Sequence, residues 1–172
     1  MNKPVRTATA DLYLSYGQFV IRDYSPDYPT PDLAYPNGLV GADFRGASVL
    51  TGIDTGWVTV TLHVLDTEPD SVELDGWDEV AEVSVDSDDG ELFVHALGED
   101  SPPELPGLAH EGPGTYRLRV HARGRDTAPH SRAEEPVENY QISTWPAEEA
   151  PATVYKQSDK RGQEYRASRP IP

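Results

Sequence analysis

Alternation of apolar and polar residues predicts that this chain is built from β-strands. In the clearest run, residues 56–65, Val58, Val60, Leu62 and Val64 fall on one face, and threonines stand on the other. A side-chain period of two is that of a half-buried strand, and threonine favours a strand over a helix. The same pattern predicts further strands over residues 11–22, 39–46, 47–52, 78–85, 91–97, 115–123, 137–145 and 152–156.

The apolar faces of these strands define a predicted core. Its members are Leu12, Leu14, Val58, Val60, Leu62, Val64, Val83, Val85, Leu92, Val94, Tyr116, Leu118, Val120, Tyr140 and Ile142. No segment carries the apolar period of a helix longer than two turns. Short strands separated by turns rich in glycine and proline are typical of an all-β fold, here an antiparallel β-sandwich of about 7–9 strands with little helix.

The connections between strands carry turn signals. Gly17 interrupts the first strand and indicates a bend. The pair Asp89-Gly90 stands between two alternating runs, which is the signal for a hairpin joining residues 78–85 to 91–97. Two proline-rich segments, 24–37 and 98–114, cannot sit in a central ladder and are predicted as surface loops.

These signals divide the chain into three parts. Residues 1–9 are polar and are predicted to be a disordered N-terminus. Residues 10–156 form the β-sandwich domain. Residues 157–172 have basic side chains without apolar periodicity and are predicted to be a flexible C-terminal tail.

Composition narrows the class of protein. The chain of 172 residues has no cysteine, which excludes disulfides and thiolate metal sites. No apolar run has the length of a signal peptide or a membrane span, so we expect a cytoplasmic protein without membrane insertion. A net charge of −16 disfavours nucleic acid as a ligand and favours a basic protein partner.

The sequence shows no pattern of catalytic or metal-binding residues. The histidines are scattered, without the close pairs that zinc sites use. There is no nucleophile elbow, phosphate loop or dinucleotide fingerprint. We therefore predict no enzyme, no catalytic residue, no metal and no cofactor. A metal-assisted hydrolase stays open only if histidines and carboxylates distant in sequence converge in space.

The negative charge is concentrated in one span. Residues 46–116 contain no lysine or arginine but hold more than half of the 30 acidic residues. Two acidic loops in this span, 66–78 and 86–91, can project from the strands. We predict that they bind a basic partner through Asp66, Glu68, Asp70, Asp75, Asp78, Asp86, Asp88, Asp89 and Glu91.

A row of arginines follows the acidic span. Arg117, Arg119 and Arg123 occupy alternate positions of one strand and are predicted to project from its outer face. Two interpretations remain: the arginines pair with carboxylates on neighbouring strands, or they form an anion site.

Aromatic residues offer an alternative function. Tyr24, Tyr28 and Tyr35 alternate with prolines in one loop, and Trp57 begins the clearest strand. This composition is compatible with a small-ligand or carbohydrate site on the sandwich. It is equally compatible with tyrosines that fix a long loop to the body of the protein.

One compact motif resembles a known family. Ser15-Tyr16-Gly17-Gln18-Phe19 is similar to the opening strand motif, Ser-Tyr-x-Gln-Phe, of the competence protein J family, which are inhibitors of DNA-entry nucleases. Residues 38–43, 57–64, 112–118 and 138–142 resemble later segments of that family. The resemblance covers residues 10–145 and implies a small β protein that binds and blocks a nuclease without catalysis of its own.

Overall fold

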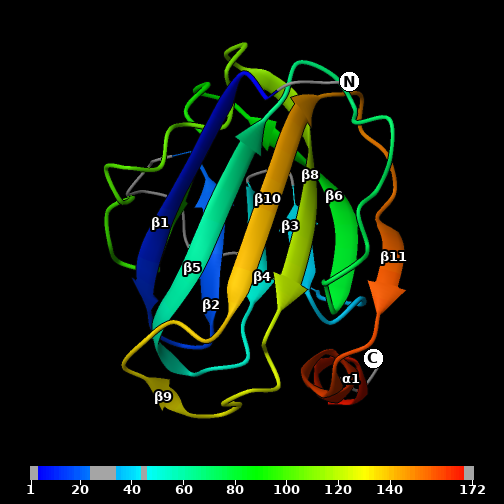
Figure 1. Cartoon of the computed structure of the whole chain (residues 1–172). Coiled ribbons are helices and arrows are strands. Elements are labelled where there is room, and N and C mark those ends of the chain that lie inside the picture. The colour runs from blue at the N-terminus through cyan, green and yellow to red at the C-terminus, as the bar shows by residue number, and fades with distance from the viewer. Residues whose placement is uncertain (1–3, 24–33, 44–45, 169–172) are drawn as a thin grey trace.

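Two β-sheets pack face to face in the computed structural model, which describes residues 4–23, 34–43 and 46–168 (Figure 1). The large sheet has the spatial order β1 (Arg6–Leu14), β5 (Thr55–Val64), β10 (Asn139–Pro146), β8 (Gly114–Arg123), β6 (Glu79–Ser87) and β11 (Thr153–Gln157), with β9 (Arg132–Ala133) beside β5. The small sheet has the order β3 (Val40–Asp43), β4 (Gly46–Leu50), β2 (Gln18–Arg22) and β7 (Phe93–His95). The all-β prediction is confirmed.

The core lies between the two sheets, as the alternation predicts. Every residue of the predicted core is buried, and the four alternating residues of β5 are fully buried. Phe19 and Ile21 of β2 meet them from the small sheet. Burying apolar area in this way is the main stabilising term of the fold, at roughly 25 cal/mol per Å².

Strand direction defines two ends of the large sheet. β5 and β10 are parallel, whereas β8 is antiparallel to both β10 and β6, so β5, β10 and β6 all run the same way. We call the end where these three strands finish the upper end, and the end where they begin the lower end; Figure 1 shows them in that orientation. The parallel pairs β5–β10 and β5–β9 depart from a purely antiparallel sandwich.

The predicted hairpin at Asp89-Gly90 is wrong. β6 lies in the large sheet, whereas β7 lies in the small sheet and pairs with β2. Gly90 has the positive φ that the turn signal implies, but Leu92 also has φ of 24°, so the chain leaves the large sheet instead of folding back along it. The run 11–22 likewise divides, at Tyr16-Gly17, into β1 and β2 of different sheets.

Both predicted flexible ends contain regular structure. β1 begins at Arg6, not after residue 9, because its backbone pairs with β5 from Arg6 opposite Val64 onward. The C-terminal segment forms helix α1 (Lys160–Ala167), with Asp159 as its N-cap. The helix has no apolar stripe, so periodicity could not reveal it. At 8 residues it is too short to cross a membrane, and the described residues contain no other helix.

Candidate functional site

The first acidic loop is a strap across the outer face of the large sheet. The strap, residues 66–78, connects the upper end of β5 to the lower end of β6. Three cationic or polar side chains hold its backbone. Arg119 Nη1 donates to Ser71 O at 3.1 Å, His121 Nε2 lies 2.9 Å from Glu73 O, and Lys156 Nζ donates to Leu74 O at 3.2 Å.

A buried ion cluster lies beneath the strap. Glu82 of β6 accepts from Arg117 Nε at 3.1 Å and from Arg119 Nε at 2.6 Å. All three side chains are at most 6% exposed. The prediction that Arg117 and Arg119 project into solvent is wrong, because the strap and the segment before β11 cover them. The interpretation that the arginines pair with carboxylates on a neighbouring strand is confirmed for these two.

Arg117 holds a second segment over the ion cluster, on the side opposite the strap. Its Nη1 donates to Ala150 O at 2.9 Å, and its Nη2 donates to Pro151 O at 2.7 Å and to Thr153 Oγ1 at 3.1 Å. These bonds attach the segment before β11 to the sheet. The ion cluster thus holds two surface segments that have little apolar area of their own.

His121 holds the strap as a neutral ring. Burial lowers the pKa of His121 to about 4, although the hydrogen bond to Glu73 O acts in the opposite sense. The ring is therefore uncharged at neutral pH, and its Nε2 carries the hydrogen that Glu73 O accepts. Beside it, a groove of about 300 Å³ separates the strap from the sheet.

The carboxylates of the strap differ in their contacts. Glu68, Asp70 and Asp75 are exposed. Asp66, whose side chain is 70% exposed, lies 3.1 Å from His110 Nε2. Asp78 is half-buried and accepts from Gly124 N at 3.0 Å, so its carboxylate joins two chain segments and we leave it out of the docking surface.

The second acidic loop is held by one buried aspartate. In this upper loop, residues 86–91, the Asp23 carboxylate accepts from Asp89 N at 2.8 Å and Glu91 N at 3.3 Å, and directly after the loop it accepts from Leu92 N at 2.8 Å. It also accepts from the Ser87 hydroxyl. Burial acts to raise the pKa of Asp23, but these hydrogen bonds outweigh it and the pKa is lowered.

The carboxylates of the upper loop mostly point away from Asp23. Asp88, Asp89 and Glu91 are exposed. Asp86 is half-buried and accepts from Thr115 Oγ1 at 2.8 Å. The loop backbone is thus fixed from inside while three negative charges remain in contact with water.

Replacing Asp23 with alanine is expected to lower the free energy of unfolding by about 3 kcal/mol at pH 7, because three backbone N–H groups, one buried and two partly buried, lose their acceptor. The pKa of Asp23 is lower in the folded state than in the unfolded state, so its charged carboxylate stabilises the folded state at neutral pH. This contribution is lost as the pH falls below the ordinary aspartate pKa of 3.8 toward the lowered pKa. The difference between wild type and Asp23→Ala should therefore shrink in that acid range. Urea denaturation from pH 7 to pH 3 measures it, with the exposed Asp11→Ala as the control. A constant difference across that range would contradict the role of the charge.

Two of the four aromatic residues of the alternative ligand site, Tyr35 and Trp57, lie within the described residues. Tyr24 and Tyr28 lie outside the described residues. Tyr35 is buried against Leu50 and Tyr165, near helix α1. Trp57 is 38% exposed on the outer face of β5, where its ring meets the Tyr13 ring at 5.3 Å between centroids.

One group of metal-ligating side chains occurs among the described residues. His110 Nε2 lies 3.1 Å from Asp66 Oδ1 and 3.8 Å from Glu111 Oε1. Both carboxylates are exposed, and the contact between Asp66 and His110 joins the strap to the loop before β8. We assign this group a structural role in fixing the upper end of the strap.

Two solved structures have a fold similar to that of this chain. The structure of ComJ from Bacillus subtilis, an inhibitor of the DNA-degrading activity of NucA, aligns with 86% of this chain and 99% of its own, at a TM-score of 0.53 and 14% identity. The chain has the fold of ComJ. The product of crocagin biosynthetic gene J aligns with 82% of this chain and 97% of its own, at a TM-score of 0.50 and 16% identity. No protein-family model and no curated protein matches the sequence.

The ComJ fold confirms the resemblance carried by the Ser15–Phe19 motif. In the structure this motif comprises the turn from β1 to β2, where the chain passes from one sheet to the other, and the first two residues of β2. Sequence patterns missed Asp23, which follows the apolar strand β2 as an ordinary acidic residue. Its role depends on backbone N–H groups more than sixty residues away, and no local signal indicates it.

Proposed function

We propose that this chain is a non-catalytic inhibitor that binds a basic, DNA-degrading nuclease through its acidic loops. The observation that carries the proposal is that buried side chains fix the backbones of the strap and the upper loop, while their carboxylates remain exposed. A surface fixed before binding loses little conformational entropy in the complex. The ComJ fold supports the choice of a nuclease as partner.

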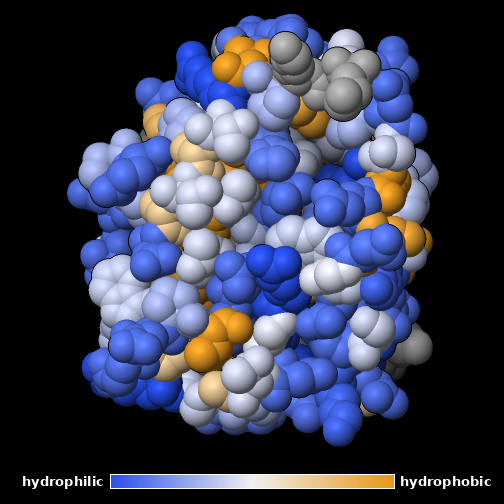
Figure 2. Space-filling view, in the orientation of Figure 1, coloured by the Kyte–Doolittle hydropathy of each residue, from blue (hydrophilic) through white to orange (hydrophobic). Residues whose placement is uncertain are grey.

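Glu68, near the start of the strap, and the exposed carboxylates of the upper loop lie toward the upper end of the large sheet, whereas Asp75 stands near the lower end of the strap. β5 and β6 both finish at the upper end, so the start of the strap and the upper loop emerge on the same side. Three strand spacings, about 14 Å, separate β5 from β6. Figure 2 shows the outer face of this sheet, on which hydrophilic colour predominates.

Charge explains why a nuclease fits such a surface. A nuclease needs a basic cleft, because its substrate carries one phosphate charge at every step of the backbone. The chain has a net charge of −16, so long-range attraction steers it toward such a cleft. Exposed carboxylates at the upper end would then occupy positions that phosphates take in the substrate.

A DNA-degradation assay tests the proposal. A purified, basic, DNA-degrading nuclease from the same cell is titrated with the chain at about 0.15 M ionic strength, where the Debye length is about 8 Å. We expect activity to disappear near equimolar chain. The triple variant Asp88→Asn, Asp89→Asn, Glu91→Gln should need about tenfold more chain, because rim charges of one sign drive association.

A matched variant controls for net charge. Glu99→Gln, Glu104→Gln and Glu135→Gln also remove three exposed carboxylates, but not from the strap or the upper loop. This variant should inhibit within about twofold of wild type, since exposed charges beyond a Debye length are largely screened. Equal weakening by both variants would contradict docking through the upper loop, and no inhibition by any of the three would contradict the function.

A further inference from the structure

Three exposed aromatic side chains gather at the lower end of the large sheet. Tyr13 is 37%, Trp57 38% and Tyr16 80% exposed. Tyr13 and Trp57 stand directly opposite each other on β1 and β5, with their rings edge to face. Tyr16 follows in the turn that leaves β1. Exposed aromatic residues at one spot are typical of contact surfaces, in which tyrosine and tryptophan often contribute most of the binding energy.

Tyr16 has a backbone conformation that is unfavourable for tyrosine, and the fold does not need a tyrosine at this position. Its φ is 65°, in the left-handed region, and Gly17 after it has the same value. Asparagine or glycine occupies this region at lower cost than a bulky residue. With 80% of its surface exposed, the ring gains no burial that would offset the cost. A contact outside the chain would supply the missing stabilisation.

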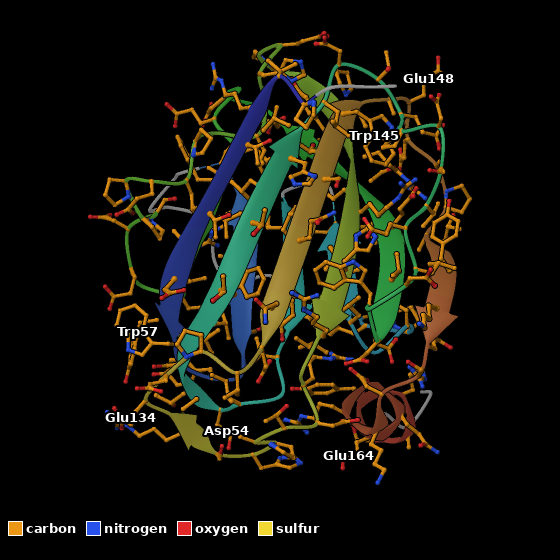
Figure 3. All side chains as sticks on the ribbon, in the orientation of Figure 1. Asp54, Trp57, Glu134, Trp145, Glu148 and Glu164 are labelled. Atoms are coloured by element: carbon orange, nitrogen blue, oxygen red, sulfur yellow. The ribbon has the colours of Figure 1, made fainter. Side chains whose placement is uncertain are left out.

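Carboxylates border the three aromatic rings. Gly17 N donates to Asp54 O at 2.9 Å, which places Asp54 beside the Tyr16 turn. Gly56 pairs with Ala133, so Glu134 follows on the strand next to Trp57. The side chains of Asp54 and Glu134 are 57% and 78% exposed; Asp54 lies 3.9 Å from Arg161 Nη2 and Glu134 lies 2.9 Å from Arg132 Nε. Exposed ion pairs of this kind are weak, so a cation from a partner can compete with them. Figure 3 shows Trp57, Glu134 and Asp54 together at the lower end.

Aromatic rings bordered by carboxylates match the chemistry of arginine and lysine. A guanidinium or ammonium group stacks on the face of a tyrosine or tryptophan and pairs with a nearby carboxylate. We propose that Tyr13, Tyr16 and Trp57, with Asp54 and Glu134, form a second docking surface for an arginine- or lysine-bearing segment of a partner protein. Charge complementarity selects this occupant.

This surface is separate from the acidic loops. Trp57 stands near the beginning of β5, and Asp66 follows its end, a separation of about 25 Å along the strand. One end of the molecule can therefore be occupied while the other stays free. The inference does not rest on the proposed nuclease contact, and each can fail without the other.

Nuclear magnetic resonance with a model peptide tests this surface. The probe is a short peptide with two arginines; the same peptide with citrulline, which keeps the shape but lacks the charge, is the control ligand. Both are titrated at about 0.15 M salt, where weak surface attraction is screened. Of the three tryptophans, Trp77 and Trp145 are 8% and 3% exposed, so the Trp57 indole signal reports the surface and the others serve as references.

We expect the arginine peptide, and not the citrulline peptide, to shift the Trp57 indole signal and the amides of Tyr16 and Asp54. Tyr16→Asn should weaken binding by about fivefold, yet melt no lower than wild type, because asparagine tolerates the left-handed region. Trp57→Ala should remove binding. Tyr155→Asn, which removes a 37% exposed ring from β11, should bind as wild type.

Three results would overturn the inference. They are equal shifts with both peptides, shifts confined to the strap and the upper loop, and a loss of binding in Tyr155→Asn as large as in Tyr16→Asn. None of them bears on nuclease inhibition, which is measured with the acidic-loop variants.

Discussion

Replacing Glu82 with alanine should lower the free energy of unfolding by about 3–5 kcal/mol, because two buried guanidinium groups would lose their shared carboxylate. Arg117 and Arg119 are 5% and 3% exposed, so water cannot replace it. The same change should loosen the strap, since Arg119 bonds both Glu82 and Ser71 O.

Urea denaturation measures the loss of stability in Glu82→Ala, and amide hydrogen exchange of residues 71–75 measures the loosening of the strap. Glu82→Gln keeps the shape but removes the charge, and it should fall between wild type and the alanine variant. Glu68→Ala, at an exposed position of the strap, is the control and should change stability by less than about 0.5 kcal/mol. A loss below about 1 kcal/mol in Glu82→Ala would contradict the role assigned to the cluster.

Replacing Arg125 with methionine is expected to destabilise the protein by a similar amount, about 3–5 kcal/mol, and to release helix α1. Arg125 is fully buried, and its Nε and Nη2 donate to the two Asp159 oxygens at 2.7 and 2.9 Å. Its Nη1 donates to Gly38 O and Leu50 O, both at 3.0 Å. The variant leaves a buried carboxylate and two carbonyl oxygens without their donor.

The charge at this site is balanced by a proton. Burial and a hydrogen bond with Asp159 raise the pKa of Glu79 to about 8, so Glu79 is mainly protonated at neutral pH. The Arg125 cation then faces one carboxylate anion, Asp159, and the pair is neutral overall. Removing the guanidinium would leave the negative charge uncompensated.

Thermal denaturation and hydrogen exchange of residues 160–167 measure both effects of Arg125→Met. Arg125→Lys should not restore stability, because an ammonium group cannot make the paired bonds to Asp159. Arg132→Met is the matched control: Arg132 pairs with Glu134 at 2.9 Å, but both side chains are well exposed, so its loss should cost less than about 1 kcal/mol. Equal losses of stability in Arg125→Met and Arg132→Met would contradict the role assigned to the buried Arg125–Asp159 pair.

Local patterns predicted the core and the fold class because these depend on neighbouring residues. Alternation in β5 identified which of its side chains are buried, whereas in β8 the side chains of both faces are buried. The predicted hairpin at Asp89-Gly90 does not form. Asp23, which directly follows β2 of the small sheet, accepts hydrogen bonds from the N–H groups of that loop and so holds the loop beside the small sheet.

Polar contacts between segments distant in sequence explain the other differences between the predictions and the structure. Arg117 and Arg119 alternate as outer-face residues should, but segments with no apolar signal cover them. Helix α1 has no apolar stripe and docks through Asp159, whose N-cap position is the only local sign of it. The exposed carboxylates of the acidic loops were predicted from charge, and their binding role stays a prediction.

Carboxylate footprinting of the chain in complex with the nuclease it inhibits tests the central claim most directly. A carbodiimide labels exposed Asp and Glu side chains, and mass spectrometry reads the label at each residue. The account predicts that complex formation protects Glu68, Asp70, Asp88, Asp89 and Glu91, whereas Glu99, Glu104 and Glu135 stay as reactive as in the free chain. Unchanged labelling of the strap and the upper loop in a complex that inhibits DNA degradation would contradict it.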